Sequence, residues 1–285
     1  MNHKSDDRDS MKISVILSTY NRPKALLVVL EALGRQDDHN FEVIVADDGS
    51  DTETRDVVNA MATKWPQCNI QHVWHEKKGF RLARIRNLAC KVCTGEYLVF
   101  LDGDCVPPPD FVSKHRTLSK DGWAVYGQRI LANKAYTEQI EENPFLLFSN
   151  KYWTYFHFFS LARKKHINRA SPAISLPGTF WRNRSPRSWE KIRGCNWAIW
   201  RRDYEAVNGS DESFEGWGAE DKDLAVRLIN NGVKMKDGRN CSFVLHLWHP
   251  QASRDRNHIQ SQIVLVRAQS HQTLPNKGLT SSKNN

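Results

Sequence analysis

Two carboxylates one residue apart, Asp102 and Asp104, follow the apolar run 97–101, Tyr-Leu-Val-Phe-Leu. Apolar, strand-forming residues on both faces of this run indicate a strand buried on both sides within a sheet. The prolines at 107–109 prevent its continuation, so the carboxylates lie where the strand leaves the sheet. In open α/β sheets ligands bind at this edge. Two carboxylates there suit a hard divalent cation that shares its remaining coordination with substrate phosphates.

The Asp-X-Asp spacing alone is weak evidence, because it also occurs at 7–9 and at 221–223. Only the pair at 102–104 follows a predicted buried strand, and this placement predicts a metal–diphosphate site. The alternative for this pair is two solvated turn aspartates that cap the next helix.

A second group of acids lies in the stretch 216–221, Gly-Trp-Gly-Ala-Glu-Asp, which precedes a predicted helix over 224–228 that Gly232 ends. Glycines let the backbone approach a bound sugar closely, and carboxylates are favoured at a helix start. The same preference makes simple helix caps the alternative interpretation of these acids.

The elements that must position these residues alternate between strand and helix. Strands are expected over 12–17, 41–46, 70–74 and 97–101, with helices over 23–33, 52–64 and 81–89 between them. This alternation predicts an α/β fold with a doubly wound, mostly parallel sheet. Polar loops at 18–21, 47–48 and 102–104 would then gather on one edge of the sheet. Together they offer an aromatic ring for a base, a carboxylate for its edge or the ribose, and a metal for phosphates.

Glycine-rich nucleotide motifs are absent from the sequence, in both the Gly-x-Gly-x-x-Gly and the Gly-x4-Gly-Lys-Ser/Thr form, so neither a dinucleotide fold nor a P-loop is supported. In the second half, 123–129 and 194–200 resemble strands, and 170–193 is expected to be a mobile acceptor loop. The stretch 144–169 is rich in aromatics and turns basic at 163–165. Such aromatics usually form core, and the alternative is an amphipathic helix on an anionic membrane surface.

The charge balance is strongly basic, at +9 for 285 residues with a pI near 9.3. It indicates polyanionic partners: nucleotide diphosphates, nucleic acid or an anionic membrane. We expect no nucleic-acid partner, since the basic residues cluster beside the predicted pocket and no nucleic-acid-binding motif occurs. No apolar stretch has the length to span a bilayer, and the polar start is unlike a signal peptide. We therefore expect a cytoplasmic protein, with peripheral contact at the cytoplasmic face of the inner membrane as an extension.

Four blocks of the first half, at 14–22, 45–50, 86–87 and 95–104, resemble the successive blocks of family 2 glycosyltransferases of the GT-A fold. Residues 216–224 resemble the Gly-Trp-Gly-Gly-Glu-Asp block of β-1,4-galactosyltransferases and bacterial chondroitin-type polymerases. The resemblance covers roughly 12–250 in the family's order, and that order makes it specific. It implies a Rossmann-like nucleotide-sugar-binding half over 11–130 and a mixed acceptor-binding, catalytic half over 131–267. We expect a disordered head at 1–10 and a disordered tail at 268–285.

The resemblance implies a nucleotide-sugar-binding role for eight residues: Ser18, Tyr20, Arg22, Asp48, Arg81, Arg86, Asp102 and Gly103. Tyr20 would stack on uracil and Asp48 would bind it. Arg81 and Arg86 would lie near the diphosphate, with a structural role for one of them as the alternative. Asp102 would face the ribose or the metal.

The metal implied by the resemblance is Mn²⁺ or Mg²⁺, with Asp104 as a ligand and a histidine late in the chain as another. Residues 245–250 contain two histidines. Strand alternation over 244–249 places His246 on one face and His249 on the other, and His246 fits better as the ligand. The alternative is a histidine that only fills a strand end.

On the acceptor side, the resemblance makes Asp221 the general base, lets Glu220 hold an acceptor hydroxyl and gives Trp217 a sugar-stacking face. Ala219 replaces the second glycine of the family's block, a departure expected to cost little. The implied activity is metal-dependent, inverting transfer of a sugar from a UDP-sugar to a hydroxyl of a glycan or lipid-linked glycan. Bacterial surface polysaccharide or lipopolysaccharide synthesis is the implied setting. The alternative is a catalytically inactive homologue that binds nucleotide sugars or glycans.

Overall fold

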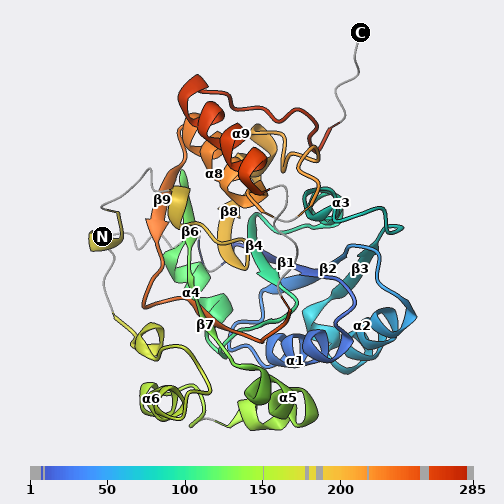
Figure 1. The fold of residues 1–285 in the computed structure, drawn as a ribbon, viewed down its shortest axis with the longest axis vertical. Coiled ribbons are helices and arrows are strands. Elements are labelled where there is room, and N and C mark those ends of the chain that lie inside the picture. The colour runs from blue at the N-terminus through green and yellow to red at the C-terminus, as the bar shows by residue number, and fades with distance from the viewer. Residues whose placement is uncertain are drawn as a thin grey trace.

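The computed structural model describes residues 8, 10–149, 151–176, 180–183, 189–216, 218–250 and 257–280, and within them one large sheet organises the molecule (Figure 1). Its strand order is β3-β2-β1-β4-β8-β6-β9. The strands are β1 (Ile13–Thr19), β2 (Phe41–Asp47), β3 (Ile70–Trp74), β4 (Tyr97–Asp102), β6 (Trp123–Tyr126), β8 (Asn196–Trp200) and β9 (Lys234–Asp237). β1 to β4 are parallel, whereas β8 is antiparallel to both of its neighbours. The predicted α/β class with a mostly parallel, doubly wound sheet is confirmed.

Helices cover both faces of this sheet, as the apolar pattern of its strands requires. Ile13, Val15 and Leu17 of β1 pack in one cluster with α1 (Pro23–Gly34) and α2 (Thr52–Lys64). Ile16 points to the other face, which is covered by the helices α3 (Leu82–Val92), α7 (Arg201–Ala206) and α8 (Glu220–Asn230). All seven residues of β1 are buried, so the continuous apolar run reflects burial on two sides.

A second, smaller sheet adjoins the large one. It consists of β5 (Cys105–Val106), β10 (Phe243–His246) and β7 (Gln128–Leu131), in that order. The sequence predicted one strand over 123–129, but the structure breaks it at Gly127. A Cβ on Gly127 would collide with the Asn196 side chain, and the chain there passes from the large sheet into the small one.

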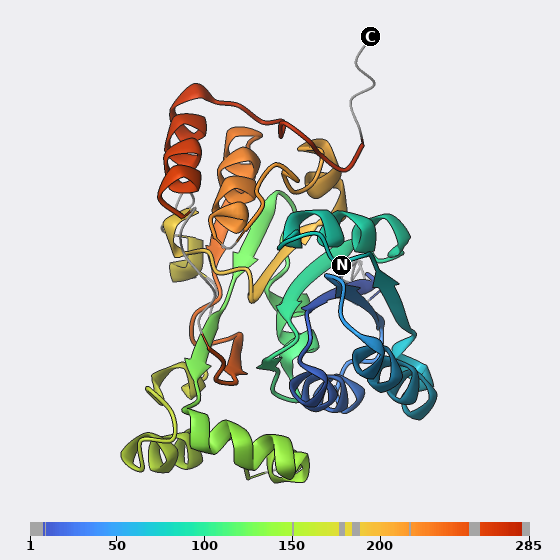
Figure 2. The same cartoon turned by 45° about the vertical axis from the view of Figure 1, so that its right-hand side comes forward.

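The two predicted halves share the large sheet, because β8 and β9 lie beyond the boundary at 130/131 and still belong to it. The division of roles between the halves stays a prediction. α4 (Phe111–Leu118) packs its Phe111 into the core shared with α1. α5 (Lys134–Glu142) and α6 (Tyr155–Arg163) lie at the end of the molecule opposite α8 and α9 (Asn257–Ser270) (Figures 1 and 2).

In the described part of the chain, five short 3-10 helices connect these elements: Pro66–Cys68, Pro144–Phe148, Ser171–Ala173, Phe180–Asn183 and Trp189–Lys191. The aromatic stretch 144–169 is thus not one helix, because the chain folds back between Pro144–Phe148 and α6. Some of its rings are core, as Tyr152 and Phe158 are, and others such as Phe156 face solvent. Within the described ranges, none of the helices has the length and apolar character needed to cross a bilayer.

The C-terminal segment differs from the disordered tail expected over 268–285, because residues 268–280 pack on the body of the molecule. Backbone N–H groups of Asn276 and Lys277 donate to the Asp211 carboxylate at 2.9 and 3.2 Å, and that of Thr280 donates to Asn208 Oδ1 at 2.8 Å. These bonds involve the backbone, so the polar composition of the segment did not reveal them. Residues 281–285, and the head apart from Arg8 and Ser10, lie outside the described residues.

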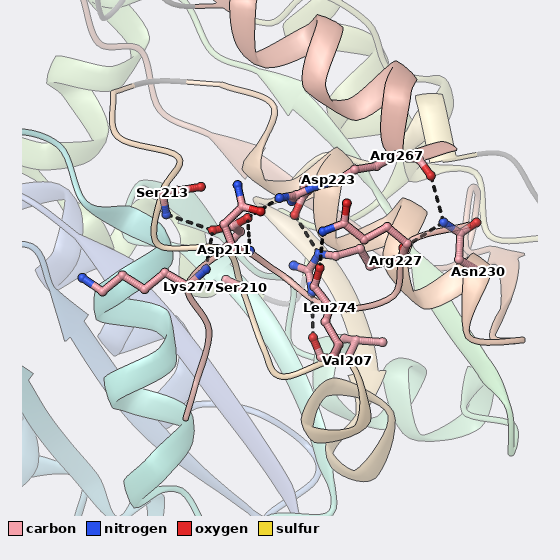
Figure 3. Close-up of polar contacts among 12 residues, drawn as sticks. Val207, Ser210, Asp211, Ser213, Asp223, Arg227, Asn230, Arg267, Leu274 and Lys277 are labelled. Carbon is pink, nitrogen blue, oxygen red and sulfur yellow. Dashed lines mark hydrogen bonds and ion pairs between the residues drawn. The ribbon is translucent and has the colours of Figure 1, made fainter. Parts of the chain in front are cut away.

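A buried network of charged side chains attaches α9 to α8 (Figure 3). Arg267 of α9 contacts Asp223 Oδ1 at 2.5 Å and Asp211 Oδ2 at 2.6 Å. Arg227 Nε donates to the other oxygen of Asp223 at 2.8 Å. Guanidinium and carboxylate groups alternate in space, so each buried charge has an opposite neighbour, as burial of ions requires. The network fixes α8, whose first residues are Glu220 and Asp221.

Glu42 holds together the starts of β1, β2 and β4 with a buried carboxylate. It accepts hydrogen bonds from Ser14 Oγ at 2.6 Å, from Thr94 N at 2.6 Å and from Lys12 Nζ at 2.9 Å. Burial acts to raise the pKa of Glu42, but the hydrogen bonds outweigh it and lower the pKa to about 2.

We predict that Glu42→Gln lowers the free energy of unfolding at pH 7 by on the order of 3 kcal/mol, since the charged form is favoured by about two pKa units. A lowered folded-state pKa stabilises above the unfolded value, about 4.3, and this stability is lost as pH falls toward about 2. The difference between the two proteins in urea unfolding should therefore shrink over that range. The exposed Glu96 supplies the control, Glu96→Gln. An equal loss at pH 7 and pH 2.5 would contradict this account.

Candidate active site

Three polar loops meet at the carboxyl-terminal edge of the large sheet, as the strand pattern predicted. The register pairs Ser18 with Asp102 and Thr19 with Asp47. Gly103 N donates to Ser18 O at 2.7 Å, so the loops after β1 and β4 are in direct contact. A Cβ on Gly103 would lie 3.0 Å from the same oxygen, which accounts for glycine at this position.

One end of this edge joins Tyr20 to Asp48. Lys77 Nζ lies 3.4 Å from the centroid of the Tyr20 ring, which is 42% exposed, and 2.9 Å from Asp48 Oδ2. Asp48 is buried, and its other oxygen contacts His75 Nε2 at 2.7 Å. Arg81 also contributes, but through its backbone N–H to Asp48, because its guanidinium donates to Glu76 O.

His75 and Lys77 were missed by sequence reasoning. They follow β3, whose carboxyl end lies at the same edge as those of β1, β2 and β4. The signal was available, since any polar residue directly after a parallel strand of this sheet belongs to that edge.

Arg86 lies at the centre of the edge and brings four of the predicted site residues together. Its side chain is 3% exposed. Nη1 contacts Asp221 Oδ1 at 2.5 Å and Glu220 Oε1 at 4.0 Å, and Nη2 contacts Asp102 Oδ1 at 3.3 Å. Nε donates to Ser18 Oγ at 3.2 Å. The structural alternative for Arg86 therefore describes its position better than a free diphosphate contact.

The start of α8 carries Glu220 and Asp221, the two acids that the sequence analysis predicted for acceptor binding and catalysis. Gly194 packs against the Asp221 carboxylate so closely that a Cβ there would collide with it. α8 begins at Glu220, four residues earlier than predicted, and Ala219 before it has φ of 69°. A left-handed backbone costs alanine about 1 kcal/mol, so the replacement of glycine is less neutral than expected. Trp217 lies outside the described residues.

Burial raises the proton affinity of two of the carboxyl groups around Arg86. Burial raises the pKa of Glu220 to about 8, with the Asp221 charge adding to this and Arg86 opposing it. Burial likewise raises the pKa of Asp102 to about 7. The positive charge of Arg86 opposes this rise, and the negative charge of Asp104 adds to it. Glu220 is thus protonated at neutral pH and can donate a hydrogen bond. Its Oε2 is buried and has no hydrogen-bond partner in the part of the chain described.

A cluster of one carboxylate and two imidazoles forms at Asp104. His246 Nε2 lies 3.7 Å from Asp104 Oδ1, and His249 Nε2 lies 3.4 Å from Asp104 Oδ2. The prediction that His249 faces away from His246 does not describe this geometry, because β10 ends at His246 and strand alternation stops there. The two imidazole rings lie 5.2 Å apart.

These three side chains suit a divalent cation. Each offers one ligand atom, and the three atoms lie within 4.8 Å of one another. Burial lowers the pKa of His246, although Asp104 opposes this, so the imidazole is in the neutral form that binds metals. Two nitrogen ligands favour a transition metal such as Mn²⁺ over Mg²⁺, which prefers oxygen.

Arg22 belongs to this cluster rather than to the end of the edge near Tyr20. Its Nη1 lies 2.9 Å from Asp104 Oδ2, and Nη2 lies 3.1 Å from Glu141 Oε1 and from Trp248 O. Its expected nucleotide-binding role would require it to leave these partners.

The protonation of Glu220 gives a testable prediction. A raised folded-state pKa means that stability is greatest below the unfolded pKa, about 4.3, and falls as pH rises toward about 8. Glu220→Gln resembles the protonated acid, so this variant should melt at a higher temperature than the native protein at pH 8 and at the same temperature near pH 4. The exposed Glu215 supplies the control, Glu215→Gln, with no such trend. A less stable Glu220→Gln at pH 8 would mean an ionised Glu220 paired with Arg86.

Comparison with known proteins matches two family models. The model "Glycosyl transferase family 2" covers residues 14–179, and "N-terminal domain of galactosyltransferase" covers 179–250. Validoxylamine A glucosyltransferase of Streptomyces hygroscopicus subsp. jinggangensis is 28% identical over 261 residues, covering 86% of this chain and 56% of that protein. Chondroitin synthase of Escherichia coli is 27% identical over 246 residues, covering 77% of this chain and 32% of that protein. The chain thus spans about half of the first relative and a third of the second.

Solved structures confirm the fold. TarS of Staphylococcus aureus has a TM-score of 0.63 at 17% identity, covering 90% of this chain and 39% of that one, and its 1–349 fragment has also been solved with UDP-GlcNAc. The mannosyltransferase PcManGT of Pyrobaculum calidifontis, in complex with GDP-Man and Mn²⁺, has a TM-score of 0.56 at 19% identity, covering 92% and 63%. The architecture is therefore GT-A. Since the first family model matches more than half of its residues, the chain belongs to glycosyl transferase family 2.

Proposed function

We propose that the chain transfers a sugar from a UDP-sugar to a hydroxyl of a glycan or lipid-linked glycan, with a divalent metal and with inversion at the anomeric carbon. One observation carries the proposal: Arg86 joins Asp102, beside the Asp104 cluster, to Asp221 at the start of α8. Donor-side and acceptor-side acids thus lie within one cluster. The names of the relatives, a glucosyltransferase and a chondroitin synthase, support transfer to glycan-like acceptors.

The nucleotide would lie at the end of the edge that Tyr20 and Asp48 form. The exposed Tyr20 ring offers a stacking face, and Asp48 is held in place by His75 and Lys77. A buried, fixed carboxylate can read the N–H edge of a uracil base. Uridine as the base has support from TarS 1–349 with UDP-GlcNAc, whereas PcManGT with GDP-Man shows that the same fold accepts another base.

Asp104, His246 and His249 would hold the metal, as Mn²⁺ in preference to Mg²⁺. When bound, such an ion supplies positive charge that stabilises the leaving diphosphate. PcManGT carries Mn²⁺ in its complex, which supports a divalent cation in this fold. Arg22 would then exchange its contact with Asp104 for one with the diphosphate.

Asp221 is the residue proposed to deprotonate the acceptor hydroxyl. Its side chain is 20% exposed and that of Glu220 is 9% exposed, so Asp221 is the more accessible of the two. Arg86 Nη1 lies 2.5 Å from Asp221 Oδ1, and burial raises the pKa of Glu220 to about 8. Glu220 can therefore hold an acceptor hydroxyl through its free oxygen. One base without a carboxylate nucleophile gives single displacement and inversion.

The setting proposed for this reaction is bacterial surface polysaccharide or lipopolysaccharide synthesis, with peripheral contact to an anionic membrane. A catalytically inactive binding homologue is the competing proposal. An assay of UDP release with Mn²⁺ separates the two, because an inactive homologue would bind UDP and release none from any UDP-sugar.

The metal site predicts the effect of removing its ligands. Asp104→Ala should weaken Mn²⁺-dependent UDP binding by at least about 100-fold, since outer partners of metal ligands alone contribute 10- to 100-fold. His249→Ala should also weaken it and leaves the contact between Asp104 and Arg22 intact. Asp56→Ala on the exposed side of α2 is the control. Calorimetry that finds unchanged Mn²⁺-dependent affinity in both site variants, with cooperative melting, would remove this cluster from the metal site.

The proposed role of Asp221 as the general base gives a second prediction. In Asp221→Asn the amide oxygen can still accept from Arg86, so stability and UDP affinity should change little. Turnover should fall by roughly 10²–10⁴, the usual contribution of a positioned base, and the remaining product should still be inverted. Asp110→Asn at the start of α4 is the control. Near-normal turnover of Asp221→Asn would assign the base elsewhere, and a large loss of stability would make Asp221 structural.

A further inference from the structure

The positive charge of the chain is unevenly distributed along the sequence. Residues 143–189 contain eight Lys and Arg residues and no Asp or Glu. The whole chain carries +9, so all other residues together carry only +1. Together with the run 77–95, which contains six Lys and Arg residues and no Asp or Glu, this segment gives anionic partners two regions of attraction.

The helix α6 within this segment turns aromatic rings outward. Phe156 is 83% exposed and Phe159 is 48% exposed, while Phe158 and Leu161 on the opposite side are buried in the core. The spacing 156, 159, 160, 163 places these exposed residues on one side of the helix. The outer face of α6 is therefore apolar where the solvent-facing side of a surface helix is normally polar.

Three cationic residues lie at the carboxyl end of α6, next to these rings. Arg163 is its last residue, and Lys164 and Lys165 follow, all exposed. Cations at a helix carboxyl end are also favoured by the helix dipole, which would explain them alone. The dipole does not explain exposed phenyl rings one and two turns before them.

We propose that the outer face of α6 binds an anionic lipid bilayer, with Phe156 and Phe159 at the boundary of headgroups and acyl chains and Arg163, Lys164 and Lys165 on lipid phosphates. A helix that carries rings on one face and cations beside them is suited to this interfacial position. α6 lies at the end of the molecule away from α8 and α9, where a flat surface can reach it (Figures 1 and 2). The inference extends the proposed function, since a lipid-linked acceptor lies at such a surface.

A second copy of the chain is a poorer occupant of the same face. In a symmetric dimer, this face would meet its own copy, and the three cations of each would approach one another. Like charges that face each other at an interface oppose association. An anionic bilayer instead supplies the complementary charge.

The test is sedimentation of the full chain with vesicles, which requires no turnover and is therefore independent of the proposed transfer reaction. The chain should sediment with vesicles of mixed phosphatidylglycerol and phosphatidylcholine at low salt, and not with pure phosphatidylcholine. Binding should be lost at about 1 M salt, where the Debye length falls to about 3 Å. Replacing Arg163, Lys164 and Lys165 together by Gln should weaken binding by about 100-fold, from the usual contribution of each cation near such a surface.

Phe156→Ser with Phe159→Ser should weaken vesicle binding by at least about 10-fold, since both rings lose their apolar contact. The matched control is Ile259→Ser with Val266→Ser, which removes two exposed apolar side chains from α9 and should leave vesicle binding unchanged. Melting temperature and UDP affinity of both pairs should equal those of the native chain. Failure of the native chain to sediment at low salt, or equal sedimentation of the Phe156/Phe159 pair, would overturn the proposal. Light scattering that shows a dimer dependent on these rings, without vesicle binding, would assign the face to a second copy.

Discussion

The buried guanidinium of Arg86 is the interaction on which the candidate site depends. It comes from α3 and neutralises acids delivered by β4 and by the start of α8, elements far apart in sequence. Three carboxylates this close in a protein interior would repel one another, and a single cation among them offsets the cost of their burial. The charges of Asp102 and Asp221 are therefore coupled through Arg86. A change of charge at Asp102 therefore alters the proton affinity of Glu220.

The single positive charge of Arg86 cannot neutralise three ionised acids. The excess negative charge therefore favours the protonated form of one of them. Glu220, deepest beside Asp221, keeps its proton, whereas Asp221 faces Arg86 at hydrogen-bond distance. A protonated Glu220 can donate a hydrogen bond, and Asp221 accepts one from Arg86. The position of α8 that maintains this geometry depends on a second buried guanidinium, Arg267, which holds Asp223 one turn later. The C-terminal segment is in this way part of the support of the site.

The sequence predicted the elements and the edge of the sheet well, because continuous apolar runs and polar loops are local signals. β3 and α2 lie at their predicted residues, and the loops after β1, β2 and β4 meet as expected. The sequence could not predict features that depend on where a strand ends or on which distant side chains bind the backbone. His249 turned toward Asp104 because β10 ends early, and the segment 271–280 was ordered by carboxylate and amide side chains from a distant loop. The pairing of Arg86 with α8 is likewise a contact between residues 135 positions apart.

The distribution of charge changes what the basic composition means. A net charge of +9 suggests a molecule attractive to nucleotide diphosphates all round, yet eight of its cations lie in the acid-free segment 143–189. The remainder sums to +1 and includes a second acid-free run, 77–95, with six Lys and Arg residues. On the edge of the large sheet, Lys77 is paired with Asp48 and Arg22 with Asp104, so their charges are already balanced. Attraction of an anionic donor to this edge must then come from local charge, and a divalent cation on Asp104 and its two histidines would supply more of it than the side chains can.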